Sequence, residues 1–258
     1  MSHAPDPRFA GIDRLYGRGS VARLAHRHVA VIGVGGVGSW AAEALARSGV
    51  GALTLIDADE VCVSNTSRQL HALEGAYGRP KVAVLAERFA AVNPALRVHV
   101  LEQFATVDTL GTIFEADYDL VLDACDALRV KVALIAGCRR RRLPLVVVGS
   151  AGGRTDATRV QVRDLSRTEH DAMLSRIRKQ LRQEFGFPRN AERFFGVPAV
   201  YSLENVRYPQ ADGTVGGRRP AGSDALKLDC GAGLGAATHV TGAFAFAAAG
   251  KVLELLWR

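Results

Sequence analysis

A glycine run is the first feature of the chain that predicts chemistry. It reads G-V-G-G-V-G over 33–38, after the β-branched segment His28–Gly33 and before a helical segment. Glycines let the backbone approach a phosphate closely, and the N-terminus of the next helix offers N–H groups to an anion. The run therefore predicts a nucleotide-binding loop, with a simple packing turn as the alternative. The residues assigned to this loop are Gly33, Gly35, Gly36 and Gly38.

An acidic residue follows the next predicted strand, where a ribose-binding carboxylate is expected. Asp57 ends the apolar segment Ala52–Asp57. A carboxylate at this place accepts hydrogen bonds from ribose hydroxyls. Up to this point, the pattern fits an NAD-binding dehydrogenase as well as an ATP-dependent enzyme.

Two cations and two amides close to the loop favour a triphosphate. Arg68 lies between Asn65 and Gln69, and Lys81 follows in G-R-P-K. Arginine gives bidentate phosphate contacts and lysine a point charge. Attack of a carboxylate on an α-phosphate develops negative charge and expels pyrophosphate, whereas hydride transfer does not. We therefore predict that Arg68 and Lys81 are catalytic, with solvated surface cations as the alternative. Nucleotide-binding roles are assigned to Asp57, Asp59, Asn65 and Gln69.

A second acidic pair ends the fourth predicted strand. D-A-C-D over 123–126 lies at the carboxyl edge of a parallel sheet, where ligands bind. Mg2+ prefers one or two carboxylates together with phosphate oxygens. One of these two acids is expected to hold Mg2+ against the phosphates. An alternative role for Asp126, compatible with the first, is the N-cap of the helical run that begins at Ala127.

The order of apolar segments predicts the fold that positions these residues. Strands are expected at 28–33, 52–57, 97–101, 119–123 and 144–149, with helices at 37–48, 81–91 and before 142. Strand alternating with helix predicts an α/β fold with a Rossmann-like, doubly wound, mostly parallel sheet. After residue 150 we expect an edge strand near 159–164, a charged helix at 170–184, an extended run at 200–208 and an apolar helix. We interpret 1–258 as one domain, with a nucleotide-binding core at 1–150 and an irregular C-terminal extension at 151–258.

Several motifs in this order resemble the ubiquitin-activating-like adenylating superfamily of the ThiF, MoeB and HesA type. The resemblance rests on RLYG, VIGVGGVGSWAAEALARSGVG, LTLIDADEV, SNTSRQ, GRPK and DACD. PLVVVGSAGGRTDATRVQVRDL and YPQADGTVG extend it toward bacterial tRNA-modifying members. The resemblance implies ATP-dependent dehydration of threonylcarbamoyladenosine next to the anticodon. In that reaction the threonyl carboxylate is adenylated and then closes to a ring, which releases AMP.

The resemblance also implies roles for residues and partners. It implies ATP and Mg2+ as cofactors, with Gly36 and its neighbours on the phosphates and Asp126 on the metal. It implies a homodimer, because Arg14 (or, as a second match, Arg8) from the other subunit's N-terminal segment reaches the phosphates. tRNA is the expected substrate, and a sulfur-relay protein is a candidate further partner.

The charge of the chain favours an anionic partner. Lys and Arg number 33 against 26 Asp and Glu, for a formal charge of +7. Cations gather at 139–142, between Arg159 and Arg189, and at Arg218, Arg219 and Lys227. We expect them to contact tRNA phosphates, with a solvated helix face as the alternative. Tyr201 and Tyr208 are expected either to stack on a base or to be ordinary strand residues.

The cysteines bear on the alternative functions. Cys62, Cys125, Cys138 and Cys230 are scattered, with no C-x-x-C pair. This argues against a thiol zinc site and against relatives that activate sulfur carriers, which have two such pairs. Activation of a small sulfur carrier's C-terminus stays the alternative function, and an NAD-binding Rossmann protein is less favoured. A carrier-activating enzyme would use a reactive thiol such as Cys230, for which we favour an inert, buried role.

Two terminal segments bear on localisation. The N-terminus contains prolines and an acid but no apolar stretch, so it does not resemble a secretion signal, and we predict a cytoplasmic protein. Residues 230–250 contain no Asp, Glu, Lys or Arg and are long enough to cross a bilayer. Most of them are Ala and Gly, so we expect a helix buried against protein and no stable membrane span. Weak membrane association through 230–254 is the alternative.

Overall fold

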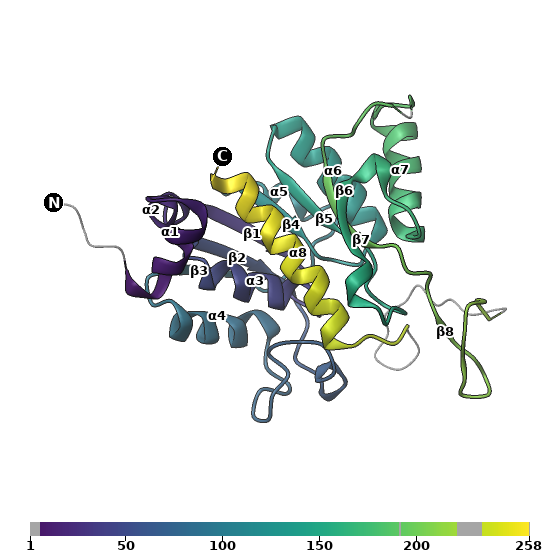
Figure 1. Cartoon of the computed structure of the whole chain (residues 1–258), viewed down its shortest axis with the longest axis horizontal. Coiled ribbons are helices and arrows are strands. Elements are labelled where there is room, and N and C mark those ends of the chain that lie inside the picture. The colour runs from purple at the N-terminus through teal and green to yellow at the C-terminus, as the bar shows by residue number, and fades with distance from the viewer. Residues whose placement is uncertain (1–5, 191, 221–233, 258) are drawn as a thin grey trace.

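The computed structural model describes residues 6–190, 192–220 and 234–257. In this part, seven strands form one sheet in the order β3-β2-β1-β4-β5-β7-β6 (Figure 1). Neighbouring strands pair in parallel, except that β6 is antiparallel to β7. The predicted α/β, Rossmann-like, mostly parallel fold is therefore confirmed. The strands are β1 (His28–Ile32), β2 (Ala52–Ile56), β3 (Arg97–Leu101), β4 (Leu120–Asp123), β5 (Leu145–Val148), β6 (Val160–Asp164) and β7 (Pro198–Ser202), and a separate pair consists of β8 (Tyr208–Pro209) and β9 (Val215–Gly216).

Helices cover both faces of the sheet, because successive strand residues point to opposite sides. Val29 and Val31 join one apolar cluster, whereas Ala30 and Ile32 join the other. The first cluster contains α3 (Gly38–Arg47), α4 (Lys81–Val92) and α8 (Thr238–Trp257), and the second contains α5 (Leu110–Ile113), α6 (Leu128–Arg141) and α7 (Ala172–Glu184). Two short helices, α1 (Ala10–Tyr16) and α2 (Ser20–Leu24), precede β1, and 3-10 turns lie at Pro7–Phe9, Val63–Asn65, Ala157–Arg159 and Leu165–Arg167.

The apolar C-terminal helix packs against the protein. In the described part, α8 is the one helix long and apolar enough to cross a membrane, with a mean hydropathy of 1.4. However, 56% of that stretch is buried, and Val240, Phe244 and Ala248 have no exposed surface. Figure 1 shows α8 crossing one face of the sheet beside α3. Packing therefore accounts for the apolar composition of this helix, as the sequence predicted.

The C-terminal half differs from expectation in one strand. The extended run was expected at 200–208, but β7 covers Pro198–Ser202 and lies inside the sheet, between β5 and β6. Proline is tolerated as the first residue of a strand. Tyr201 has no exposed surface. Of the two alternatives for Tyr201, the ordinary strand residue is therefore confirmed, and stacking on a base is wrong.

Candidate active site

A cavity of about 560 Å³ lies at the carboxyl ends of the central strands. Residues that the sequence placed far apart along the chain meet there, because parallel strands end at a common edge. The predicted residues that line it are Gly33, Gly35, Gly36, Asp57, Asp59, Asn65, Arg68, Gln69, Lys81 and Asp126. Gly38 and Arg14 are not among the lining residues.

The glycine loop is closed by contacts that exclude side chains. Gly33 has φ +81°, and a Cβ atom there would lie 2.9 Å from the Cα of Cys125. A Cβ atom on Gly38 would lie 1.9 Å from the carbonyl oxygen of Gly33. Gly38 is therefore required for the loop to close on itself, although it does not line the cavity.

The first turn of α3 has no side-chain cap. Its N-cap residue is Val37, whose apolar side chain accepts no hydrogen bond from the N–H groups of the first turn. Gly35, Gly36 and Val37 line the cavity. The loop is also tied to β2, because the Val34 N–H donates to Oδ2 of Asp57 at 2.9 Å. Uncapped N–H groups at a helix start make a site for an anion such as phosphate.

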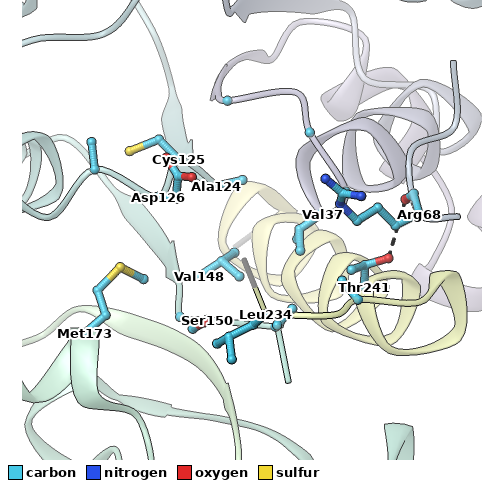
Figure 2. Close-up of a pocket in the computed structure, with 18 of the residues that line it drawn as sticks. Val37, Arg68, Ala124, Cys125, Asp126, Val148, Ser150, Met173, Leu234 and Thr241 are labelled. Carbon is cyan, nitrogen blue, oxygen red and sulfur yellow. Dashed lines mark hydrogen bonds between the residues drawn. The ribbon is translucent and has the colours of Figure 1, made fainter. Parts of the chain in front are cut away.

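Arg68 is anchored through its backbone, and its side chain faces the glycine loop. Trp40 Nε1 donates to the Arg68 carbonyl at 3.1 Å, and Thr241 Oγ1 from α8 approaches the same oxygen at 3.5 Å. A Cβ atom on Gly36 would lie 3.3 Å from Cγ of Arg68. Figure 2 shows Arg68 beside Val37 and Thr241, with Cys125 and Asp126 across the cavity.

Lys81 is the second cation of the cavity and opens α4. Its residue exposure is only 5%, so the alternative of a solvated surface cation is wrong for this lysine. Its Nζ donates to Oδ2 of Asp59 at 2.7 Å, which fixes the ammonium at the cavity wall. Arg68 and Lys81 therefore bring two positive charges to the side of the cavity formed by the glycine loop.

Both predicted amides are buried and held in place. Asn65 Oδ1 accepts from the Cys62 N–H at 3.0 Å. Gln69 Oε1 lies 2.9 Å from Nε2 of His71, while Nε2 of Gln69 lies nearest to the Cβ position of Gly35. A neutral His71 that donates from Nε2 thus turns the amide NH2 of Gln69 toward the loop. His71 was not predicted as a site residue, because its one signal in the sequence is that it lies two residues after Gln69.

Burial, and then the charge of Lys81, lower the pKa of His71 from 6.5 to about 4. Between these values an unfolded chain binds a proton that the folded protein does not, so stability falls as the pH falls below 6.5. We expect His71 to account for roughly 2 kcal/mol of lost stability by pH 5. Urea denaturation at pH 7.5 and 5 should therefore show a smaller loss for His71→Asn than for the wild type. Equal losses in the two proteins would contradict this assignment.

The acidic side of the cavity rests on a buried ion pair. Asp126 lines the cavity and is exposed, but the N-cap of α6 is Ala127 without a side-chain bond, so the N-cap role predicted for Asp126 is wrong. Behind it, Asp123 and Lys131 have no exposed surface, and Lys131 Nζ lies 3.0 Å from Asp123 Oδ1. Nζ also donates to the Val148 carbonyl at 2.8 Å, which ties β4 to β5 beneath the cavity. Lys131 was not predicted as a site residue from the sequence, where its one signal is that it is the single lysine of α6.

The cysteine that lines the cavity is a poor nucleophile. Burial, reinforced by the charge of Asp123, raises the pKa of the Cys125 thiol well above its usual range. Its Sγ donates to Asp123 Oδ1 at 3.1 Å. The reactive species of cysteine is the thiolate, which this environment disfavours. Cys230, the thiol considered in the sequence analysis, lies outside the described residues.

Arg14 lies far from the cavity of its own chain. It is exposed on α1, where the ring of Tyr16 lies 3.8 Å from that of Trp257 at the end of α8. Thr241, near the start of α8, lies beside Arg68. A helix rises about 1.5 Å per residue, so these two places on α8 are about 24 Å apart. Arg14 would therefore meet a cavity only in another copy of the chain, and its role stays a prediction.

Some residues of the basic segments pack on aromatic rings away from the cavity, whereas others line the cavity. Arg139 lies over the ring of Phe187 at 4.1 Å, and Arg182 over Phe195 at 5.2 Å. Residues 139–142 follow α6 to its end, roughly 20 Å from the helix start beside the cavity. Arg176 and Tyr208, in contrast, line the cavity. Lys227 lies outside the described residues.

Comparison with known proteins gives consistent results. A family model described as the ThiF family matches residues 10–256. The chain is 46% identical over 98% of its length to a tRNA threonylcarbamoyladenosine dehydratase of Escherichia coli (strain K12), of which it covers 95%. A structure of the Escherichia coli dehydratase TcdA in complex with ATP is similar with a TM-score of 0.84 at 43% identity, covering 96% and 93% of the two chains. An AMP complex of that enzyme gives 0.85 at 42% identity, covering 99% and 98%.

Proposed function

This chain belongs to the ThiF family, and we propose that it is an enzyme that uses ATP to dehydrate threonylcarbamoyladenosine in tRNA, next to the anticodon. The observation that carries the proposal is the cavity in which Arg68 and Lys81 lie beside an uncapped helix start and a glycine loop. A relative that is similar over almost the whole chain carries the dehydratase name. We propose that 1–258 is one domain, with the nucleotide-binding core at 1–150 and the C-terminal extension at 151–258.

The reaction proceeds in two substitutions. An oxygen of the threonyl carboxylate attacks the α-phosphorus of ATP, and the bond to pyrophosphate breaks. A nucleophile within the same modified base then attacks the activated carbonyl carbon, and AMP leaves with the former carboxylate oxygen. The RNA thereby becomes lighter by one water. Arg68 and Lys81 stabilise the charge that develops on the phosphates, and the N–H groups of the glycine loop position them.

Mg2+ is part of this proposal, and the residues present fit it. In the described ranges, no three His, Cys, Asp or Glu side chains gather as an all-protein metal site. Asp126, however, presents an exposed carboxylate to the cavity. Mg2+ with a nucleotide commonly takes one or two carboxylates together with phosphate oxygens and water. Asp126 would hold the ion, which would neutralise phosphate charge.

The partners follow from the same proposal. The RNA substrate is tRNA, and the enzyme works as a homodimer in which Arg14 of one protomer completes the cavity of the other. A sulfur-relay protein is a further candidate partner. We propose a cytoplasmic location without a stable membrane span, and the burial of 56% of the apolar stretch of α8 supports packing against the protein.

Activation of a sulfur carrier is the competing function, and release of AMP separates the two. The purified protein would be incubated with Mg-ATP and either threonylcarbamoyl-modified tRNA or the same tRNA without the modification. We expect AMP and pyrophosphate with the modified RNA and neither with the unmodified one. Equal release with both RNAs, or loss of activity in Cys230→Ala, would favour the sulfur-carrier function instead. Calorimetric binding of NAD in preference to ATP would overturn both.

A further inference from the structure

The cavity continues beyond the residues that surround the nucleotide. Its second part is lined by the end of β5, the first turns of α7 and the segment that leads into β8. Figure 2 shows Met173 of α7 on the far side of the cavity from Arg68, with Val148, Ser150 and Leu234 between them. We call this second part the α7 arm and define it by Ser150, Met173, Arg176, Val206 and Tyr208.

A hydrogen-bonded clamp holds α7 against the end of β5. Asp171 caps α7 by accepting from the Leu174 N–H at 2.8 Å, and its other oxygen accepts from the Ser150 N–H at 2.7 Å. A Cβ atom on Gly149 would lie 2.4 Å from that carboxylate, so only glycine fits at the contact. The first turns of α7 are thereby fixed at the mouth of the cavity.

Arg154 holds the opposite wall of the arm. It is 3% exposed, and its guanidinium donates to the carbonyls of Ser150 at 2.9 Å and His170 at 3.0 Å, and also to that of Glu204. The segment that leads into β8 is bound to the loop of Arg154, because the Arg207 N–H donates to the Gly153 carbonyl at 2.8 Å. Tyr208 therefore lies on a wall that is rigidly connected to α7.

Arg176 is the one arginine of the α7 arm without a protein partner in the described part of the chain. It is exposed and lies three residues after Met173, so the two side chains share the helix face that lines the arm. Two acids of the adjoining walls are occupied, since Asp171 accepts the bonds above and Glu204 accepts from the N–H groups of Thr155 and Asp156. Arg176 thus brings to the cavity a positive charge that forms no ion pair with any described residue, although the exposed carboxylate of Asp126 lines the same cavity.

We propose that the α7 arm receives the RNA substrate and that Arg176 binds an anionic oxygen group of it, either a backbone phosphate or the threonyl carboxylate. This inference rests on the proposed function. An arginine guanidinium can form two parallel hydrogen bonds with either a phosphate or a carboxylate. The aromatic ring of Tyr208 could stack on an unpaired base, and Met173 and Val206 offer it apolar contacts. The nucleotide and the RNA would then approach each other from opposite parts of one cavity.

Anisotropy binding of anticodon stem-loop RNA, with and without the threonylcarbamoyl group, tests the proposal. We expect Arg176→Ala to weaken binding roughly tenfold or more, as for loss of a charge-assisted bond. Weaker binding of both RNAs, with a salt slope lower by about 0.7, identifies a phosphate. Weaker binding of the modified RNA alone identifies the carboxylate. Arg97→Ala is the matched control, since Arg97 is exposed at the opposite end of the sheet, where β3 begins.

Affinities of Arg176→Ala for both RNAs within twofold of the wild type would overturn the proposal. The melting temperature should be unchanged, because Arg176 contacts no described residue through a polar bond. AMP release is measured in parallel on the wild type. If the wild type binds RNA but releases no AMP, the proposed function is contradicted and the assignment of Arg176 stands. If the wild type releases AMP and Arg176→Ala binds RNA as tightly as the wild type, only the assignment of Arg176 is contradicted.

Discussion

Replacement of Arg68 by alanine should lower the rate of AMP release by about 100- to 1,000-fold, the usual effect of removing one group that stabilises a charged transition state. The fold should survive, because Arg68 is anchored by its backbone carbonyl, which accepts from Trp40 Nε1 at 3.1 Å. Its guanidinium donates to the Ser64 carbonyl at 3.0 Å. Single-turnover assays with modified tRNA and Mg-ATP would measure the loss.

Two further variants separate charge from geometry. Arg68→Lys keeps the positive charge but loses the bidentate fork, so we expect intermediate activity. Arg79→Ala is the matched control, because Arg79 precedes Lys81 by two residues and pairs with the exposed Glu87 outside the cavity. Exposed pairs contribute little to stability, so this variant should behave as the wild type. Full turnover by a folded Arg68→Ala protein would disprove the phosphate role.

Lys131→Met should produce the largest loss of stability, about 3–5 kcal/mol, because it leaves a buried carboxylate without its counter-ion. Lys131 and Asp123 both have no exposed surface, and the Nζ–Oδ1 distance is 3.0 Å. Methionine fills a similar volume, so the loss would report charge and hydrogen bonding rather than a cavity. The free energy of unfolding in urea is the measurement.

A double variant tests the physical reason for that loss. Lys131→Met with Asp123→Leu removes both charges, and we expect it to regain part of the stability. Lys251→Met is the control, because Lys251 pairs with Glu254 on the partly exposed side of α8 and should cost less than about 1 kcal/mol. A loss of less than 1 kcal/mol in Lys131→Met, similar to that of the control, would contradict the buried-pair account.

The sheet and the nucleotide side of the cavity could be predicted because their signals are local. Strands β1, β2, β4 and β5 are buried on both faces, so each appears in the sequence as a short, continuous apolar run. Parallel strands end at one edge, so motifs after β1, β2 and β4 had to meet. The contact between the glycine loop and Arg68 follows from this topology.

The remaining features depend on contacts that no local pattern carries. The position of β7 between β5 and β6 is a matter of long-range pairing, and its short run lies among glycines and prolines that suggested irregular structure. The roles of Lys131 and Arg154 can be assigned only once their partners in other segments of the chain are known. Arg176 was visible as one cation in a charge run, but its place at the cavity required the clamp between Asp171 and Ser150.

Mass spectrometry of tRNA nucleosides tests the central claim most directly. Threonylcarbamoyl-modified tRNA would be incubated with the wild-type protein, ATP and Mg2+, then digested under conditions that spare the fragile ring. We predict a modified nucleoside lighter by one water, formed in step with AMP and absent when ATP is omitted. If the protein is folded and binds ATP but the mass of the nucleoside does not change, the account is contradicted.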